Sequence, residues 1–483
     1  MAKRFYVTTS IPYVNARPHI GHALEFVQAD VFARFQRSVG HEVFLLAGTD
    51  DNALKNVQAA EVAGKPVAEY VAEHASFFTE TLTRLAITPD YFIRTSSDER
   101  HRAGAQKLWE SCRPEDMYKK KYRGLYCVGC EEFKTEKEIS GGECPEHPGK
   151  KLEVVEEENY FFRLSEYRGR LEELIASDTL KVTPESRKNE MLSFIRSGLE
   201  DFSISRSVER ARGWGVPVPG DESQVMYVWF DALANYITAL EYGIGGQLFE
   251  TWWRDDASHK VHFIGKGINR FHSIYWPAML LSAGVPLPHE VVVHGYLTVG
   301  GVKMSKSVGN VIDPDDLVHA YGTDAVRYYL LRHVSPFEDS DFTIEKFKEA
   351  YNANLANGLG NLVARVLRLA SEHLDSPVDI SQIRGMPNIS HSLKRYEFNQ
   401  ALDSLWNNIS VLDGLIQEGK PFELIKTNRK NAQKQITYLI KELARIAKHL
   451  KPFMPETSKK IEKAILENKK PENLFPRLPA QTS

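Results

Sequence analysis

The stretch RFYVTTSIPYVNARPHIGHALEFVQADVFARFQRSVGHEVFLLAGTDD, residues 4–51, determines the fold class of the chain. FYVTTS is an apolar run that predicts a buried strand, and the turn IPYVNARP follows it. A helix is expected next, because apolar residues recur on one helical face (Leu24, Val27, Val31 and Phe35). HEVFLLAG predicts a second strand beyond Gly40, where this helix ends. Strand, helix and strand at this spacing form a βαβ unit, so we expect an α/β fold with a parallel, doubly wound sheet of the Rossmann type.

The same signals return far downstream. KVHFIGKG predicts a strand, FHSIYWPAMLL a helix, and EVVVHGYLTV a further single strand. The region between the two halves is rich in Lys, Glu and Gly and is expected to be an insertion in the sheet domain. From about residue 320 the pattern is helical to the end.

These signals divide the chain into consecutive segments. We expect the first half of the Rossmann-type domain at 1–114, a connective insertion at 115–224, the second half of the sheet domain at 225–306, a linking region at 307–350, and an all-α domain at 351–483.

Composition sets the broad class. The chain has 483 residues and a net charge of −3, which predicts several domains and no globally basic nucleic-acid surface. No signal peptide and no apolar run of membrane-spanning length are present, so we expect a soluble, cytoplasmic monomer without a membrane partner. Basic residues outnumber acidic ones between Lys420 and Lys470. This basic helical region either contacts phosphates or is a solvated helical face.

The tetrapeptide HIGH, residues 19–22, lies where the first helix begins. In doubly wound sheets ligands bind beyond the carboxyl ends of the strands, and a helix N-terminus favours an anion. His19 and His22 can donate hydrogen bonds to phosphate oxygens, and Gly21 allows a close approach to the backbone. Histidines at a helix start are also commonly structural, so this motif alone leaves both interpretations open.

A second motif favours phosphate chemistry. GGVKMSKSVGN places Lys303 and Lys306 in a Gly-flanked loop. Two lysines in such a loop can close over a triphosphate and follow the charge to the leaving pyrophosphate. A solvated basic loop is the alternative, and the presence of HIGH in the first half of the same domain makes it less plausible.

The cysteines indicate a metal site. Cys127, Cys130, Cys144 and His147 offer three thiolates and one imidazole with paired Cys-X2 spacings, a closed tetrahedral set typical of one structural Zn²⁺. Scattered reduced cysteines are the alternative. Cys112 has no such neighbours and is expected to be simply buried.

Taken with IPYVN, GTDD, YVWFDALANY, GKGINRFHSIYWPAML, HGYLTV and PFMPET, these motifs give the chain a resemblance that spans most of its length. It resembles the class I aminoacyl-tRNA synthetases and is most similar to their methionyl family. The insertion is shorter than the hydrolytic editing domains of the leucyl, isoleucyl and valyl families, which also favours the methionyl family.

The resemblance implies methionine, ATP with Mg²⁺, and tRNA(Met) as substrates and partners. It implies catalysis by His19, His22, Lys303, Lys306 and Arg206, and nucleotide contacts from His19, Gly21, His22, His294, Gly295, Lys303 and Lys306. The implied methionine pocket consists of Ile11, Tyr13, Asp50, Trp229, Ala232, Tyr236, Ile268 and His272. Within the all-α domain, the implied anticodon-binding residues are Asn361, Arg365 and Phe422.

Several positions depart from the family pattern. Asn52 and Gly267 stand where a histidine and an aspartate are usual, and Phe422 and Asp413 replace a tryptophan and an asparagine. Two alternatives remain open from the sequence: a class I synthetase for another amino acid, and a catalytically silent paralogue that only binds RNA. Amino-acid-dependent exchange of pyrophosphate into ATP distinguishes all three.

Overall fold

The computed structural model describes residues 3–134, 139, 141–145, 151–304, 309–383 and 385–479. Contacts within the chain divide it into two compact units. Unit 1 comprises residues 1–18, 36–80 and 88–294, and unit 2 comprises residues 19–35, 81–87 and 295–483. Each unit is therefore built from segments that are far apart in the sequence.

Unit 1 is organised around a six-stranded sheet of order β3-β2-β1-β12-β13-β7, in which every neighbouring pair is parallel. Its strands are β1 (Arg4–Thr9), β2 (Glu42–Thr49), β3 (Tyr91–Arg94), β12 (Ser258–Gly265), β13 (Glu290–His294) and β7 (Lys181–Thr183). The strand order reverses between β1 and β12, which is where doubly wound sheets bind ligands. The predicted parallel doubly wound sheet is thereby confirmed.

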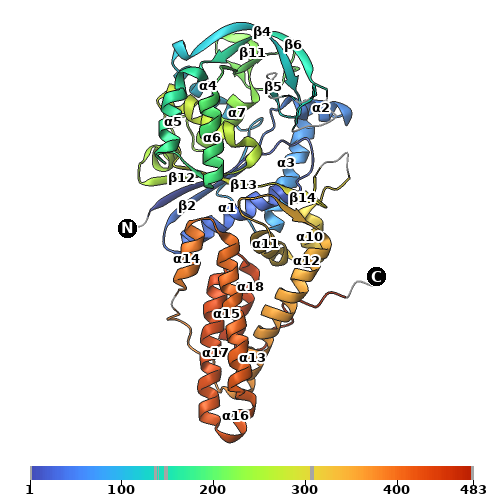
Figure 1. Cartoon of the computed structure of the whole chain (residues 1–483), viewed down its shortest axis with the longest axis vertical. Helices are drawn as coiled ribbons and strands as arrows, with labels where there is room; N and C mark the ends of the chain where they lie inside the picture. Colours follow the sequence, from blue (N-terminus) through green and yellow to red (C-terminus); the bar gives the residue numbers. More distant parts are fainter. Residues whose placement is uncertain are drawn as a thin grey trace. The chain divides into compact units, whose positions relative to one another are not determined.

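Unit 1 also contains several helices (Figure 1). They include α2 (Leu54–Val62), α4 (Glu99–Ser111), α5 (Arg168–Ala176), α6 (Glu185–Ser197), α7 (Val228–Thr238), α8 (Gln247–Phe249) and α9 (Trp276–Ala283), while α3 (Val67–Arg84) runs from unit 1 into unit 2. Every residue of α7 is buried, and α7 packs against α4. Gly104 of α4 permits this approach, because a Cβ there would lie 2.5 Å from Thr238 Cγ2.

The expected insertion contains its own antiparallel sheet, of order β5-β4-β6-β8 (Figure 1). The strands are β4 (Met117–Cys127), β5 (Glu132–Lys134), β6 (Glu153–Phe162) and β8 (Phe202–Ser203). A smaller sheet follows, of order β10-β11-β9, made from β9 (Ser205–Ser207), β10 (Pro217–Val218) and β11 (Asp221–Met226). β7 lies within the same sequence segment but joins the edge of the main parallel sheet.

The prediction of a single strand over EVVVHGYLTV is wrong. β13 ends at His294, and Leu297–Val299 form β14 of a separate sheet with β15 (Val302–Lys303) and β16 (Ser340–Phe342). A Cβ at Gly295 would lie 2.3 Å from the carbonyl carbon of Glu338, so the chain turns here at a residue without a side chain. β16 also interrupts the region that was expected to be helical to the end.

Unit 2 is mainly helical (Figure 1). Its helices are α1 (Ile20–Ser38, whose last residues belong to unit 1), α10 (Pro314–Tyr321), α11 (Thr323–Arg332), α12 (Ile344–Ala350), α13 (Asn361–His373), α14 (Pro387–Lys394), α15 (Phe398–Gly419), α16 (Pro421–Thr427), α17 (Arg429–Leu450) and α18 (Pro455–Leu466). A π-helix, Tyr351–Gly360, joins α12 to α13. α17 packs against α13, α15 and α18 through one apolar face. Within the described ranges, no helix combines the length and apolarity needed to cross a membrane.

Arg327 is fully buried and contacts three separate sequence segments of unit 2. The Arg327 guanidinium donates to the carbonyl oxygens of Leu85, Pro452 and Phe453 at 3.0, 2.8 and 2.8 Å. It also lies 2.7 Å from the Asp30 carboxylate of α1. The buried charge is thus neutralised and hydrogen-bonded, as a buried charge must be. Two of the acceptors are the main-chain carbonyls of the first two residues of PFMPET.

Candidate functional site

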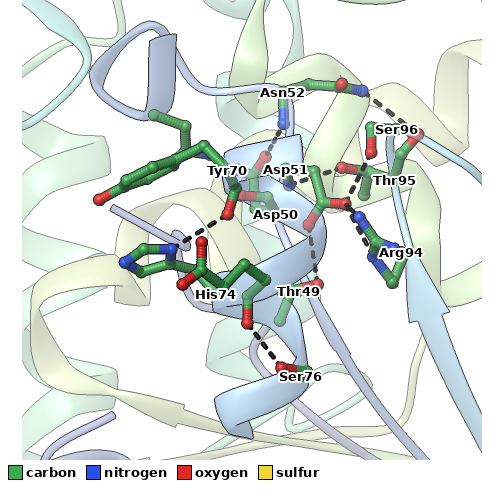
Figure 2. A network of polar contacts seen from close by, with 12 residues as sticks. Thr49, Asp50, Asp51, Asn52, Tyr70, His74, Ser76, Arg94, Thr95 and Ser96 are labelled. Atoms are coloured by element: carbon green, nitrogen blue, oxygen red, sulfur yellow. Dashed lines mark hydrogen bonds and ion pairs between the residues drawn. The ribbon is translucent and has the colours of Figure 1, made fainter. Parts of the chain in front are cut away.

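Two neighbouring carboxylates follow the carboxyl end of β2 in unit 1, and the second is fully paired (Figure 2). The Asp51 carboxylate accepts from Arg94 at 3.0 Å, from the Ser96 hydroxyl at 2.7 Å and from the Thr49 hydroxyl at 2.8 Å. Asp51 is therefore a structural group that holds the end of β2 against the chain beyond β3.

Asp231 of α7 is a third buried carboxylate, and it too has partners. His101 Nε2 lies 2.8 Å from Asp231 Oδ1, and Asn52 Nδ2 donates to Asp231 Oδ2 at 2.7 Å. His101 Nδ1 in turn lies 2.9 Å from the Thr238 hydroxyl. Asn52, which departs from the family pattern, is thus the last member of a buried hydrogen-bond network that also contains Asp231, His101 and Thr238.

Asp50 differs from both neighbours. Among the described residues, its carboxylate accepts only the backbone N–H of Asn52, at 3.1 Å. Burial raises the pKa of Asp50 well above its usual value, and the nearby Asp231 carboxylate raises it further. A buried carboxylate with no cationic partner among the described side chains is suited to bind a cation such as an ammonium group.

A chain of aromatic rings begins at Tyr13, whose hydroxyl is influenced by the Asp50 charge. Tyr13 pairs with Asp50 in an isolated parallel bridge, and its ring meets that of Trp229 edge-on at a centroid distance of 6.4 Å. Trp229 stacks on Phe271 at 3.7 Å with the planes 6° apart. The Tyr13 hydroxyl and Trp229 Nε1 are buried without a hydrogen-bond partner among the described residues. Unpartnered polar atoms of this kind favour a ligand-binding site.

The remaining pocket residues continue from α7. The Tyr236 hydroxyl lies 2.7 Å from His272 Nε2, and His272 Nδ1 lies 2.9 Å from the carbonyl oxygen of Ile268. Since Nδ1 contacts a carbonyl, it carries the ring proton, and the Tyr236 hydroxyl donates to Nε2. Ala232 occupies the α7 turn between Trp229 and Tyr236.

Ile11 completes the set of predicted methionine-pocket residues. A Cβ at Gly48 would lie 3.1 Å from the Ile11 side chain and 2.4 Å from the Ile93 carbonyl oxygen, so Ile11 packs against the end of β2 only because residue 48 is glycine. Contacts within unit 1 thus link Tyr13 to Asp50 and Trp229, and His272 to Tyr236 and Ile268, while the grouping of all eight residues into one pocket stays a prediction. Sequence reasoning missed the contact of Phe271 with Trp229 and that of Asn52 with Asp50. It also missed the His101–Asp231 pair, to which Asn52 is hydrogen-bonded; Asp231 and Phe271 lie inside the motifs that carried the resemblance.

The HIGH sequence opens α1 in unit 2. The rings of His19 and His22 stack at 3.8 Å. The backbone N–H of Gly21 donates to His19 Nδ1, and that of His19 donates to His22 Nδ1, both at 3.1 Å. Burial lowers the pKa of His19 to about 4, so its ring is neutral at neutral pH and keeps its proton on Nε2. Such a neutral N–H group can donate to a phosphate oxygen.

Of the second predicted loop, Met304 is described and lies near Gly21 within unit 2. The backbone N–H of Ile20 donates to the Ile312 carbonyl at 3.0 Å, and a Cβ at Gly21 would lie 3.6 Å from Met304 Cε. The backbone of Lys303 belongs to β15, whereas Lys306 lies outside the described residues. His294 is the buried last residue of β13, directly before the turn at Gly295.

Arg206 lies in β9, buried in unit 1. Its guanidinium stacks over the rings of Tyr126 and Tyr227, 4.4 and 4.7 Å from their centroids, and lies 3.7 Å from the Glu131 carboxylate. Burial opposes its charge, but Tyr126, Glu131 and Tyr227 raise the pKa of Arg206 above its usual value. These contacts anchor Arg206 within the insertion.

Three of the four predicted metal ligands converge. Ligand atoms of Cys127, Cys130 and Cys144 all lie within 4.8 Å of one another, and the Sγ atoms of Cys130 and Cys144 are 3.4 Å apart. Sulfurs on one tetrahedral Zn²⁺, with Zn–S bonds of about 2.3 Å, would be separated by roughly 3.8 Å, so these thiols fit one ion. His147 lies outside the described residues. Cys112 is buried and not in this cluster, as expected.

The predicted anticodon-binding residues lie on two contacting helices of unit 2. Asn361 and Arg365 belong to α13, and Phe422 belongs to α16. Phe422 is 46% exposed, which is unusual for a large apolar ring and leaves a face available for stacking. Arg365 forms an ion pair with Asp413 of α15.

A doubly wound sheet divided by an insertion, a HIGH sequence and a KMSKS loop define a class of nucleotide-dependent ligase. The chain belongs to the class I tRNA synthetases: the profile of the family described as tRNA synthetases class I (M) matches residues 5–152 and 146–367.

Within that class, the similar proteins are methionine–tRNA ligases. The Thermotoga maritima enzyme is 41% identical over 97% of this chain and 76% of its own length, and the Nostoc sp. enzyme is 40% identical over 95% of this chain and 89% of its own. Among solved structures, Mycobacterium tuberculosis methionyl-tRNA synthetase in complex with methionyl-adenylate superposes with a TM-score of 0.88 at 35% identity, covering 99% of both chains.

Proposed function

We propose that this protein is a methionine–tRNA ligase: it activates methionine with ATP and transfers it to the 3′ end of tRNA(Met). The observation that carries the proposal is the buried Asp50 carboxylate, which has no cationic partner among the described side chains and lies near Tyr13, whose ring in turn meets that of Trp229. The carboxylate matches the ammonium of an amino acid, and aromatic faces suit the unbranched thioether of methionine. The relatives named methionine–tRNA ligase support the same conclusion.

In the first step the methionine carboxylate attacks the α-phosphorus of ATP, and pyrophosphate leaves. Catalysis is mainly positioning and charge stabilisation. We assign hydrogen bonds to phosphate oxygens to the Nε2–H groups of His19 and His22, and neutralisation of the triphosphate to Lys303 and Lys306. We further assign contacts with the nucleotide to His294 and Gly295 and a catalytic role to Arg206; Mg²⁺ would supply further neutralisation of the phosphate charge.

In the second step the terminal adenosine 2′-hydroxyl of the tRNA attacks the adenylate carbonyl, and AMP leaves. We assign recognition of the anticodon to Asn361, Arg365 and Phe422 in the all-α segment 351–483. Single-stranded bases are bound by stacking on aromatic or guanidinium planes and by hydrogen bonds to their edges, which these side chains can supply.

We assign one structural Zn²⁺ to Cys127, Cys130, Cys144 and His147. Thiolate and imidazole are the ligands that zinc prefers, and four protein ligands leave no position for a reacting group. The ion would therefore hold the insertion together and take no part in the reaction.

Exchange of labelled pyrophosphate into ATP tests the function directly. We expect exchange that depends on methionine, followed by charging of tRNA with a CAU anticodon. Stronger exchange with leucine or cysteine would identify a synthetase for another amino acid, and no exchange with any amino acid would identify a silent RNA-binding paralogue.

A further inference from the structure

Lys55, in the first turn of α2, contacts both the cysteine-containing turn of the insertion and the predicted amino-acid pocket, which belong to different sequence motifs. Its Nζ donates to the carbonyl oxygen of Gly129 at 3.0 Å. The same ammonium lies 3.6 Å from the centroid of the Tyr13 ring, which is within the range of a strong cation–π contact. Gly129 lies between Cys127 and Cys130, whereas Tyr13 borders Asp50 and Trp229.

A buried carboxylate reinforces this link. Glu131 directly follows Cys130, has no exposed surface, and adopts a φ of 56°. Its Oε1 accepts the backbone N–H of Lys55 at 2.8 Å, and its Oε2 accepts the Tyr126 hydroxyl at 2.5 Å. The Tyr227 hydroxyl donates to the Glu131 carbonyl oxygen. The Cys127–Glu131 turn is therefore attached to α2 both through a backbone N–H and through the Lys55 ammonium.

We infer that Lys55 is a positioning residue that couples the conformation of the Cys127–Glu131 turn to the shape of the amino-acid pocket. When the turn holds the Gly129 carbonyl in place, the ammonium is fixed above the Tyr13 ring. Tyr13 is then held edge-on to Trp229. When the turn is disordered, Lys55 loses one anchor and Tyr13 loses a fixed neighbour on the pocket wall.

The chemistry of Lys55 suits this role better than a catalytic one. Its ammonium contacts a carbonyl oxygen and the aromatic face of Tyr13, a member of the predicted pocket. The coupling accordingly predicts an effect on methionine affinity rather than on the rate of reaction at phosphorus. This inference rests on the proposed function, because it takes methionine as the ligand of the pocket.

The test is a methionine titration monitored by tryptophan fluorescence, which requires no turnover; Trp229 is one of seven tryptophans, so its contribution is identified as the part of the signal lost in Trp229→Phe. Lys55→Met should weaken methionine binding about 3- to 30-fold, the range set by one partly desolvated cation–π contact. Lys55→Arg should stay within about threefold of the parent, since guanidinium can both donate to Gly129 and stack on Tyr13. Lys65→Met is the matched control, because Lys65 pairs with Glu73 on the surface of unit 1.

Removal of the metal, alone and combined with Lys55→Met, tests whether the two changes act through the same contact. Treating the parent with a chelator should weaken methionine binding as Lys55→Met does, and the same treatment should add little to Lys55→Met, because both act through one link. Additive losses, or equal methionine affinity in Lys55→Met and the parent, would overturn the coupling while leaving the proposed function intact. A parent chain that does not bind methionine at all would instead overturn the proposed function, and this inference with it.

Discussion

Arg365 and Asp413 form an ion pair across α13 and α15, and each side chain is about one-third exposed, at 33% and 34%. Gln417 donates a further hydrogen bond to the Asp413 carboxylate at 2.9 Å. The arginine that we assign to the anticodon is therefore held by an acid in the free protein. RNA phosphates and base edges must compete with that acid for the guanidinium.

Asp413→Asn should strengthen tRNA binding. The change keeps the size of the side chain but removes the competing charge, and an exposed ion pair is worth about 0–1 kcal/mol. We expect the KM for tRNA to fall by up to about fivefold, with methionine-dependent pyrophosphate exchange unchanged. Asp403→Asn breaks a comparable pair with Arg332 and should leave the KM alone. A KM that rises in Asp413→Asn would show that the aspartate assists anticodon binding.

Asp50→Asn should abolish the ammonium contact. Losing one partner of a buried charge pair costs about 2–5 kcal/mol in methionine affinity. In the parent, methionine binding should weaken as pH falls through the raised pKa of Asp50, because the ammonium requires the ionised carboxylate. Calorimetric titration across pH measures both effects. Asp255→Asn, which removes a carboxylate paired with Arg4, should keep the parental pH dependence.

The same substitution should raise thermal stability in the absence of methionine. The pKa of Asp50 is higher in the folded chain than in the unfolded chain, so between the two values the folded state binds more protons. Stability consequently falls as pH rises through that window, and Asn removes the loss. Thermal melts at neutral pH should show a higher Tm for Asp50→Asn than for the parent; a lower Tm would mean that the carboxylate stabilises the free protein.

Phe422→Ala should impair tRNA recognition and spare amino-acid activation. Stacking of one base on an aromatic ring is worth about 1–3 kcal/mol, and this ring is exposed on α16. Charging kinetics measure tRNA recognition, and pyrophosphate exchange measures amino-acid activation. Leu466→Ala removes another exposed apolar side chain, on α18, and should have no effect on charging. Parental charging by Phe422→Ala would refute the assignment of this surface.

Gly21→Ala should damage the first reaction step without weakening methionine binding. A Cβ at this position would lie 2.9 Å from two atoms of the His19 ring, so the imidazole must move. Loss of one preorganised donor to a developing charge typically costs on the order of 10²–10³ in rate. Gly414→Ala is the control, because the corresponding Cβ in α15 meets nothing within 4 Å. An unaffected exchange rate in Gly21→Ala would exclude a role for the His19 position.

Elemental analysis should find about one zinc per chain, and chelation should lower the Tm. Cys127→Ser should lose the metal, since it removes one of the converging thiols. Cys112→Ser should keep it: burial raises the pKa of Cys112 to about 12, and its sulfur is not part of the cluster. A chelated protein with the parental Tm would contradict a structural metal.

The parallel sheet was predictable because strand and helix periodicities repeat at regular spacing on both sides of the insertion. The break between β13 and β14 was not, because it depends on the close approach of Gly295 to the backbone of Glu338, far along the chain. β7 was also missed: three residues are too few to show any periodicity.

The pocket residues were predictable only through resemblance to a family. No local pattern distinguishes Asp50 from Asp51. Arg94 and Ser96, from another part of the chain, pair with Asp51, whereas among the described side chains no cation pairs with Asp50. The role of Lys55 could likewise not be predicted from the sequence, because its two partners, Gly129 and Tyr13, lie in segments that come together only in the folded unit.

Arg327 has a consequence for how this protein can be dissected. A fragment beginning at Gly295 would contain nearly all the helices of unit 2 and would look self-sufficient in sequence. It would lack Asp30 and the Leu85 carbonyl, leaving a buried guanidinium without its counter-ion and one of its acceptors. An uncompensated buried charge of this kind costs about 3–5 kcal/mol, a large part of a domain's total stability. The C-terminal helices are thus not a detachable module, because their fold is completed by Asp30 and Leu85, which lie far earlier in the sequence.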